Sequence, residues 1–115
     1  MSVEPRLQVR FYRTEAGNEP VREWLKMLPP EEKKSIGDDL KTAQYGWPLG
    51  MPLIRKLEPG LWEVRSRLQD RIARVIFTVE GDTMVLLHGL IKKSEKMPQQ
   101  DLQLARQRLQ SLAKN

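Results

Sequence analysis

Residues 61–79 read LWEVRSRLQDRIARVIFTV, and this stretch decides the fold. Apolar and polar side chains alternate over residues 61–68, and a second, largely apolar run follows over residues 72–79. Two such runs separated by a short polar turn predict a β-hairpin. If the turn has a two-residue loop, Arg65 lies directly opposite Arg74.

Three arginines share one face of this predicted hairpin. The alternation places Arg65, Arg67 and Arg74 together, whereas an odd slip in register would move Arg74 to the other face. Glu63 belongs to the same row of side chains. A strand carboxylate among arginines is more typical of a salt-bridge partner that orients them than of a general base, and both roles stay open at this point.

A third strand is predicted over residues 84–91, after a turn at Gly81–Asp82. A two-residue loop there pairs Arg74 with Gly89, and the missing side chain would leave space for a nucleic-acid backbone or base. Continued alternation brings Lys93 to the Arg74 face. The sequence therefore predicts a sheet face with cations gathered at its edge.

The segments on either side of these strands complete the fold. Their patterns predict a strand over residues 7–11, helices over 20–28 and 30–46, an irregular connection over 46–59 and a final helix that begins at Pro98. The order is β-α-α-β-β-β-α. We expect the α+β class, with an antiparallel sheet of about four strands, an N-terminal helical hairpin and a C-terminal helix, and with the helices on one face of the sheet.

Composition limits what this fold can do. The chain has 115 residues, and 20 Lys and Arg exceed 15 Asp and Glu by a formal charge of +5, so we expect a single basic domain over residues 1–115 that suits a polyanionic partner. The absence of Cys and the presence of one histidine argue against disulfides, thiolate zinc sites and multi-histidine metal sites. That histidine, His88, is expected on the core-facing side of the sheet as a hydrogen-bonded structural residue. No apolar segment reaches membrane-spanning length, so a cytoplasmic protein is expected.

A cationic face of this kind can support phosphodiester chemistry without a metal or another cofactor. The attacking group would be the 2′-hydroxyl of the RNA itself, which DNA lacks. Arginine and lysine side chains would stabilise the additional charge that develops on phosphorus, and one of them would protonate the leaving 5′-oxygen. The pattern alone fits an ordinary solvated surface as well.

Several runs resemble the HigB-like branch of the RelE/ParE toxin superfamily. They are LEPGLWEVR at residues 57–65, RVIF at 74–77, LLHGLIKK at 86–93 and the closing helix after Pro98 with Ala105–Arg106. Toxins of this superfamily are small α+β proteins, and RelE-type members cleave mRNA in the ribosomal A site without metal. A cognate antitoxin, which often carries a helix-turn-helix DNA-binding domain, holds them inactive.

The resemblance implies roles for particular basic residues. The catalytic cations would be Arg65, Arg67, Arg74 and Lys93. Their positions in the polar segment after the last strand also make Lys92 and Lys96 RNA- or ribosome-binding candidates, and simple solvation of that segment is the alternative that stays open. RelE itself uses a tyrosine near its C-terminus, whereas Tyr12 and Tyr45 are the only tyrosines here and both precede Lys93, so the sequence identifies no general base.

The resemblance leads us to expect the toxin of a type II toxin–antitoxin system that cleaves mRNA on the ribosome and inhibits translation. Its partners would be the ribosome, mRNA and a cognate antitoxin, with no membrane involved. The alternatives are a ParE-like inhibitor of DNA gyrase, which needs no catalytic cations, and a basic domain that binds nucleic acid without cleaving it. The cationic face is also partly apolar and needs a cover, either an antitoxin segment or the chain's own C-terminal helix.

Overall fold

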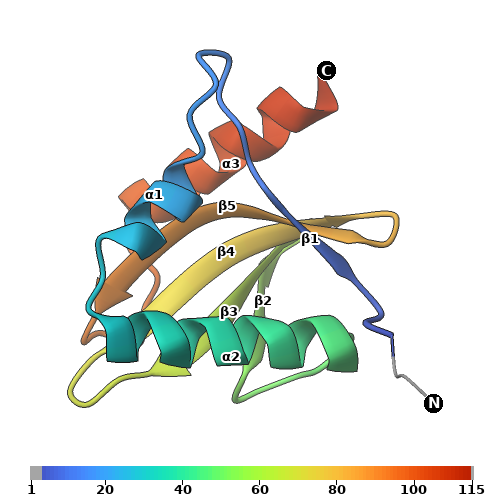
Figure 1. The fold of residues 1–115 in the computed structure, drawn as a ribbon. Coiled ribbons are helices and arrows are strands. Elements are labelled where there is room, and N and C mark those ends of the chain that lie inside the picture. Colours follow the sequence, from blue (N-terminus) through green and yellow to red (C-terminus); the bar gives the residue numbers. More distant parts are fainter. Residues whose placement is uncertain (1–3, 115) are drawn as a thin grey trace.

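The computed structural model describes residues 4–114 as three helices and a five-stranded sheet (Figure 1). In chain order the elements are β1 (Gln8–Phe11), α1 (Pro20–Lys26), α2 (Pro30–Gly46), β2 (Ile54–Glu58), β3 (Leu61–Arg67), β4 (Ile72–Glu80), β5 (Thr83–Lys92) and α3 (Gln99–Ala113). The predicted α+β class and the C-terminal helix are confirmed. No helix within residues 4–114 combines the length and the apolar composition needed to cross a membrane.

The sheet differs from the prediction in two ways. Its strand order is β1-β5-β4-β3-β2, so a fifth strand, β2, forms within the segment that was expected to be irregular. The edge strand β1 runs parallel to β5, which makes the sheet mixed rather than antiparallel. The antiparallel rule applies to strands joined by tight turns, and β1 is separated from β5 by two helices and three strands.

Helices cover both faces of the sheet, so the expectation that they lie on one face is wrong. Residues of α1 and α2, including Val21 and Ile36, belong to the core on one face. On the other face, Ala105 of α3 packs in a second core with strand residues such as Leu61 and Ile76. The middle strands bury side chains on both sides, as the continuous burial of Ile72–Thr78 shows, and each apolar face requires a cover. The C-terminal helix supplies the cover on the cationic face.

The β3–β4 hairpin has the predicted register. Trp62 pairs with Phe77, and Arg65 pairs with Arg74. The Leu68 amide donates a hydrogen bond of 2.9 Å to the Arg71 carbonyl and closes the turn. This local pairing places Arg65 and Arg74 on the same face of the sheet, which is the face that α3 covers.

The β4–β5 pairing departs from the prediction because β5 contains a bulge. The predicted register holds near the turn, up to the pair of Phe77 with Leu86, and then shifts by one residue. Arg74 consequently pairs with Leu90, and Gly89 pairs with Val75. One extra residue in a strand reverses the face of every side chain beyond it. Gly89 therefore turns toward α1 and away from the arginines.

The ring of Trp24 on α1 fills the space over Gly89. A Cβ atom added at Gly89 would overlap the six-membered part of this ring. The glycine is thus required for a helix to approach the sheet closely, and its open side is occupied by the protein itself rather than by a nucleic acid.

Replacing Gly89 by alanine is expected to lower the free energy of unfolding by about 1–3 kcal/mol, because the methyl group must displace the indole. Urea denaturation of Gly89→Ala measures this change. The matched control is Gly37→Ala on α2, where an added Cβ meets no atom within 4 Å. Its expected effect is a gain of about 0.5–1 kcal/mol from helix propensity. Equal effects of the two substitutions would contradict this account of Gly89.

Candidate functional site

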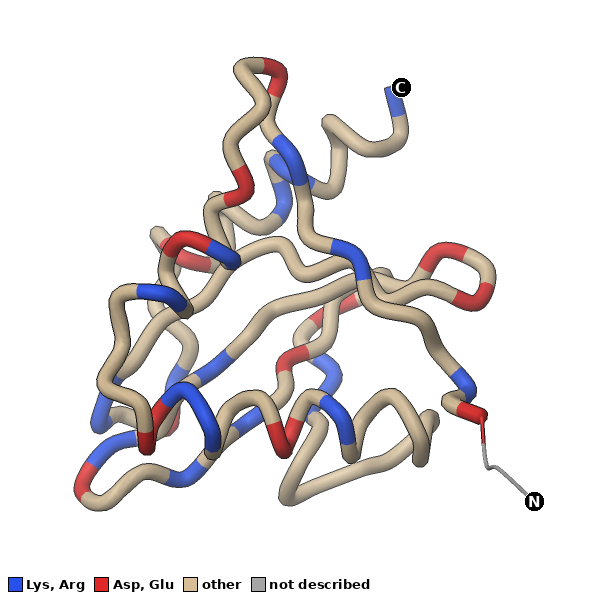
Figure 2. Tube along the Cα trace, viewed as in Figure 1, with Lys and Arg blue, Asp and Glu red and all other residues tan. Residues whose placement is uncertain are grey.

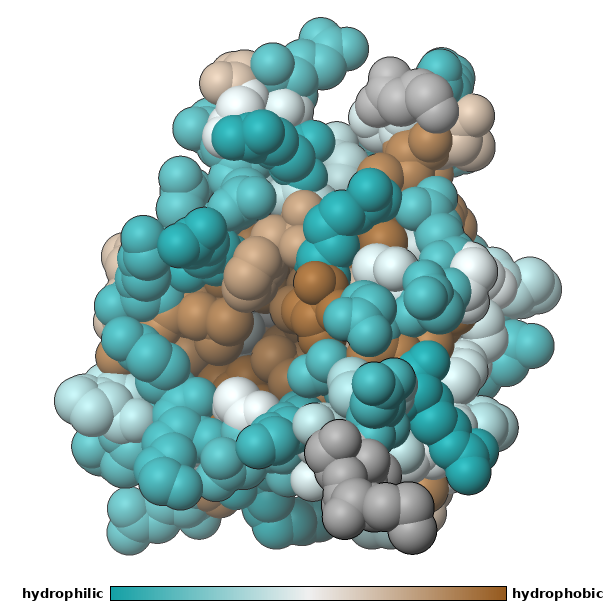
Figure 3. All heavy atoms as spheres, turned by 45° about the vertical axis from the view of Figure 1, so that its right-hand side comes forward, coloured by the Kyte–Doolittle hydropathy of each residue, from teal (hydrophilic) through white to brown (hydrophobic). Residues whose placement is uncertain are grey.

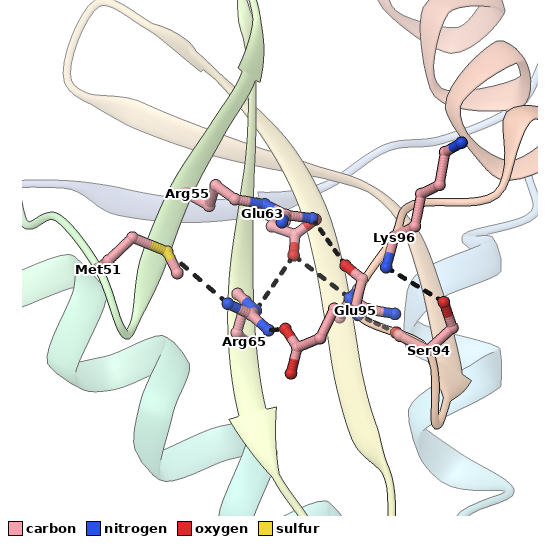
Figure 4. A network of polar contacts seen from close by, with 8 residues as sticks. Met51, Arg55, Glu63, Arg65, Ser94, Glu95 and Lys96 are labelled. Carbon is pink, nitrogen blue, oxygen red and sulfur yellow. Dashed lines mark hydrogen bonds and ion pairs between the residues drawn. The ribbon is translucent and has the colours of Figure 1, made fainter.

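One buried carboxylate, that of Glu63 on β3, lies among three arginines (Figure 4). Its oxygens are 3.3 Å from Nη2 of Arg55, 3.5 Å from Nε of Arg65 and 3.3 Å from Nε of Arg74. The side chains of Glu63 and Arg74 are completely buried, and that of Arg65 is 9% exposed. We call these four residues the arginine cluster.

Strand pairing brings the arginine cluster together. Arg55 on β2 pairs with Glu63, and Arg65 on β3 pairs with Arg74 on β4. Glu63 and Arg74 are diagonal neighbours on the same face, within reach of long side chains. Two arginines directly opposite each other repel, and the carboxylate between the strands offsets this repulsion.

The arginine cluster carries more positive than negative charge in a buried setting. Burial lowers the pKa of Arg74, and the nearby Glu63 carboxylate opposes this shift by favouring the charged guanidinium. Arg74 Nη1 is buried without a hydrogen-bond partner among residues 4–114. An unsatisfied donor beside excess positive charge favours the binding of an anion.

Residues 93–98, which connect β5 to α3 and which we call the capping segment, close the arginine cluster from outside. Nη2 of Arg74 donates to the Ser94 carbonyl, and Nη2 of Arg55 donates to the Glu95 carbonyl at 3.2 Å. Nη2 of Arg65 donates to the Glu95 carboxylate, whose side chain is 67% exposed. In this structure, therefore, all three guanidinium groups are engaged by the protein's own oxygens.

Basic residues, with acidic residues among them, lie along the chain at the end of the sheet that holds the β3–β4 turn (Figure 2). Two adjoining hollows, of about 240 and 270 Å³, share Arg67 and Ile72 in their walls. Arg65 lines the first hollow, and Arg71 and Lys93 line the second. Arg67 and Lys93 are exposed there, whereas Arg71 pairs with the carboxylates of Glu32 and Asp70. Carboxylates also line the hollows, at Asp39, Asp70 and Glu95.

The predicted site residues thus divide into buried and exposed ones. Arg65 and Arg74 belong to the buried arginine cluster, whereas Arg67 and Lys93 are exposed beside the hollows. Because of the bulge in β5, Lys92 rather than Lys93 follows the Arg74 row, where it pairs with Ile72. The prediction that alternation brings Lys93 to the Arg74 face is therefore wrong, although Lys93 does reach the same end of the sheet.

The two residues predicted to bind RNA or the ribosome are both exposed, but they lie at different places relative to the arginine cluster and the hollows. Lys92 is the last residue of β5, next to the exposed Lys93. Lys96 lies in the capping segment, and Figure 4 shows its side chain turned away from the arginine cluster. Lys92 accordingly lies nearer to the end of the sheet where the hollows open.

Arg55 is the site residue that sequence reasoning missed. It lies on β2, in the segment expected to be irregular, where a bulge between Lys56 and Glu58 interrupts the alternation. The available signal was weak. A five-residue run with two basic residues lies between Pro52 and the Pro59–Gly60 turn. Proline and glycine on both sides of such a run are expected at the ends of a short edge strand.

His88 lies on the face opposite to the one predicted, because the same bulge moves it. Its Nε2 is 2.6 Å from Oδ1 of Asp101, an early residue of α3. The predicted structural role agrees with this contact, which joins β5 to α3. Glu63 likewise has the arrangement predicted for a salt-bridge partner that orients arginines.

The chain matches the model of a known protein family. The model of a family described as phage derived protein Gp49-like (DUF891) matches residues 23–110, which include the whole arginine cluster and the capping segment. No curated protein matches the chain.

Replacing Glu63 by glutamine is expected to lower the free energy of unfolding by about 3–5 kcal/mol, because it leaves the buried Arg74 without a counter-charge. Chemical denaturation at neutral pH measures the loss. Glu80→Gln is the matched control, since it breaks an ion pair with Arg10 whose side chains are 46% and 57% exposed. That exposed pair contributes about 0–1 kcal/mol. A loss for Glu63→Gln no larger than for the control would refute the proposed electrostatic role of Glu63.

Proposed function

We propose a function for this chain on the premise that it belongs to the Gp49-like phage-derived protein family, a RelE/toxin-like family of toxin–antitoxin systems. The chain is a type II toxin of the HigB-like branch. It acts in the cytoplasm as a ribosome-dependent mRNA endonuclease and thereby inhibits translation. The observation that carries the proposal is the arginine cluster with excess positive charge, bordered by the exposed cations Arg67 and Lys93.

The proposed reaction uses the RNA's own nucleophile. The 2′-hydroxyl loses its proton to a general base and attacks the adjacent phosphorus, which forms a 2′,3′-cyclic phosphate. The bond to the 5′-oxygen breaks, and this oxygen takes up a proton from Arg67 or Lys93. The ribosome holds the mRNA in position, and the cations stabilise the charge that accumulates on the phosphate oxygens in the transition state.

The proposed protein partner is a cognate antitoxin with a helix-turn-helix domain. Large apolar side chains are exposed at the end of α2 and in the connection that follows, at Tyr45, Leu49 and Met51. Figure 3 shows, in addition, an apolar hollow surrounded by polar groups on one side of the molecule. Exposed apolar surface of this kind supports a role in binding another protein.

Arg67→Ala and Lys93→Ala are each expected to reduce mRNA cleavage by about 10²–10³-fold, by analogy with the loss of one donor to an oxyanion. The assay incubates purified protein with ribosomes programmed with a defined mRNA and maps the new 5′ ends by primer extension. Both side chains are exposed, so these variants are expected to retain the stability of the parent.

Lys33→Ala provides the matched control, because Lys33 is an exposed lysine on α2 and its loss changes the net charge equally. It is expected to cleave like the parent. Absence of codon-phased cuts by the parent protein would overturn the nuclease proposal. Gyrase-dependent DNA breaks in a parallel assay would then identify a ParE-like inhibitor, and RNA binding without cleavage would identify a binding module.

A further inference from the structure

The capping segment presents three oxygen acceptors to the three arginines of the cluster. They are the carbonyl oxygens of Ser94 and Glu95 and one carboxylate oxygen of Glu95. Figure 4 shows how this short piece of chain lies against the guanidinium groups of β2 and β3. Only the carboxylate is charged. These acceptors converge with one negative charge, which is also the charge that the two non-bridging oxygens of a phosphodiester share.

The two carboxylates beside the arginines differ in how firmly they are held. Glu63 is completely buried in the middle of β3 and contacts all three arginines. Glu95 lies between β5 and α3, with its side chain 67% exposed and in contact with Arg65. Release of Glu95 into water costs little in solvation, whereas removal of Glu63 would leave buried charges uncompensated. Glu63 therefore belongs to the permanent framework, and Glu95 is the exchangeable anion.

We propose that the Glu95 carboxylate occupies the place of the substrate phosphate, and that Ser94 and Glu95 swing away when a phosphodiester of single-stranded RNA binds to Arg55, Arg65 and Arg74. This inference rests on the proposed function, because it takes RNA as the substrate. Glu95 is thus an internal competitor that keeps the arginine cluster satisfied when the site is empty.

Charge balance supports the exchange. Three guanidinium groups against the carboxylates of Glu63 and Glu95 leave one positive charge in excess. A phosphodiester carries one negative charge, so its exchange for Glu95 leaves that excess unchanged. The transition state of 2′-hydroxyl attack adds a further negative charge to the phosphate, and the remaining positive charge is available to stabilise it. The site therefore binds the transition state more strongly than the ground state.

The rest of the arginine cluster stays in position when Glu95 leaves. Nε of Arg65 keeps its ion pair with Glu63, and its Nη1 lies 3.7 Å from the sulfur of Met51. Arg55 and Arg74 also keep their contacts with Glu63. The guanidinium groups are thus oriented before the substrate arrives, which lowers the entropic cost of binding it.

The test measures binding of a short single-stranded 2′-O-methyl RNA, which cannot be cleaved through its 2′ position, to the full chain without ribosomes. Glu95→Gln is expected to bind this oligonucleotide about fivefold more tightly than the parent, because the competing ion pair is absent. Isothermal titration at fixed ionic strength gives the Kd. The Nε–H NMR signal of Arg65 is expected to shift on binding in both proteins.

Glu31→Gln is the matched control, since Glu31 is an exposed carboxylate in the first turn of α2 and its loss changes the net charge equally. The proposal is overturned if Glu95→Gln binds no more tightly than Glu31→Gln, or if the Arg65 signal does not respond. A lower cleavage rate on ribosomes with unchanged affinity would instead assign Glu95 as the general base. Because binding is measured without ribosomes, tighter binding by Glu95→Gln together with an absence of ribosomal cleavage would retain the phosphate site and reject the nuclease function.

Discussion

The Glu63 carboxylate determines the arrangement of the functional end of the sheet. It lies completely buried between β2 and β4, and it compensates three guanidinium groups that would otherwise repel one another across adjacent strands. Buried ion pairs of this kind often contribute little net stability compared with apolar residues of similar volume. We interpret the arginine cluster accordingly as a device that fixes the direction of Arg55, Arg65 and Arg74, in keeping with the anion site proposed above.

The site combines this fixed interior with a changeable exterior. The capping segment closes the arginine cluster with two backbone carbonyls and the Glu95 carboxylate, while Arg67 and Lys93 stay exposed beside the hollows. The chain belongs to a RelE/toxin-like family, and the proposed toxin function can use both the buried arginines and the exposed cations. The action on mRNA proposed above requires cations that contact the RNA chain broadly and others that engage one phosphate closely.

The β3–β4 hairpin was predictable because its alternation and its short turn are local features. The register of β5 was not, because Met84–Leu87 are all buried and an unbroken apolar run contains no signal for a bulge. That single extra residue moved His88 and Gly89 to faces opposite to those predicted. β2 was missed because a short edge strand with a bulge has too little periodicity to distinguish it from a loop. The parallel pairing of β1 with β5 could not be predicted, because the two strands are far apart in the chain and no tight turn joins them.

The sequence by itself determined the α+β class, the pairing of Arg65 with Arg74, the basic charge and the resemblance to the toxin superfamily, because these depend on composition, short-range periodicity and motif order. Only the tertiary structure decided that Arg74 is buried, that Arg55 joins it and that Ser94 and Glu95 close the cluster. These contacts join residues on separate elements, up to 40 positions apart in the chain. Burial and charge compensation depend on what the whole fold places around a side chain, and no local pattern records that.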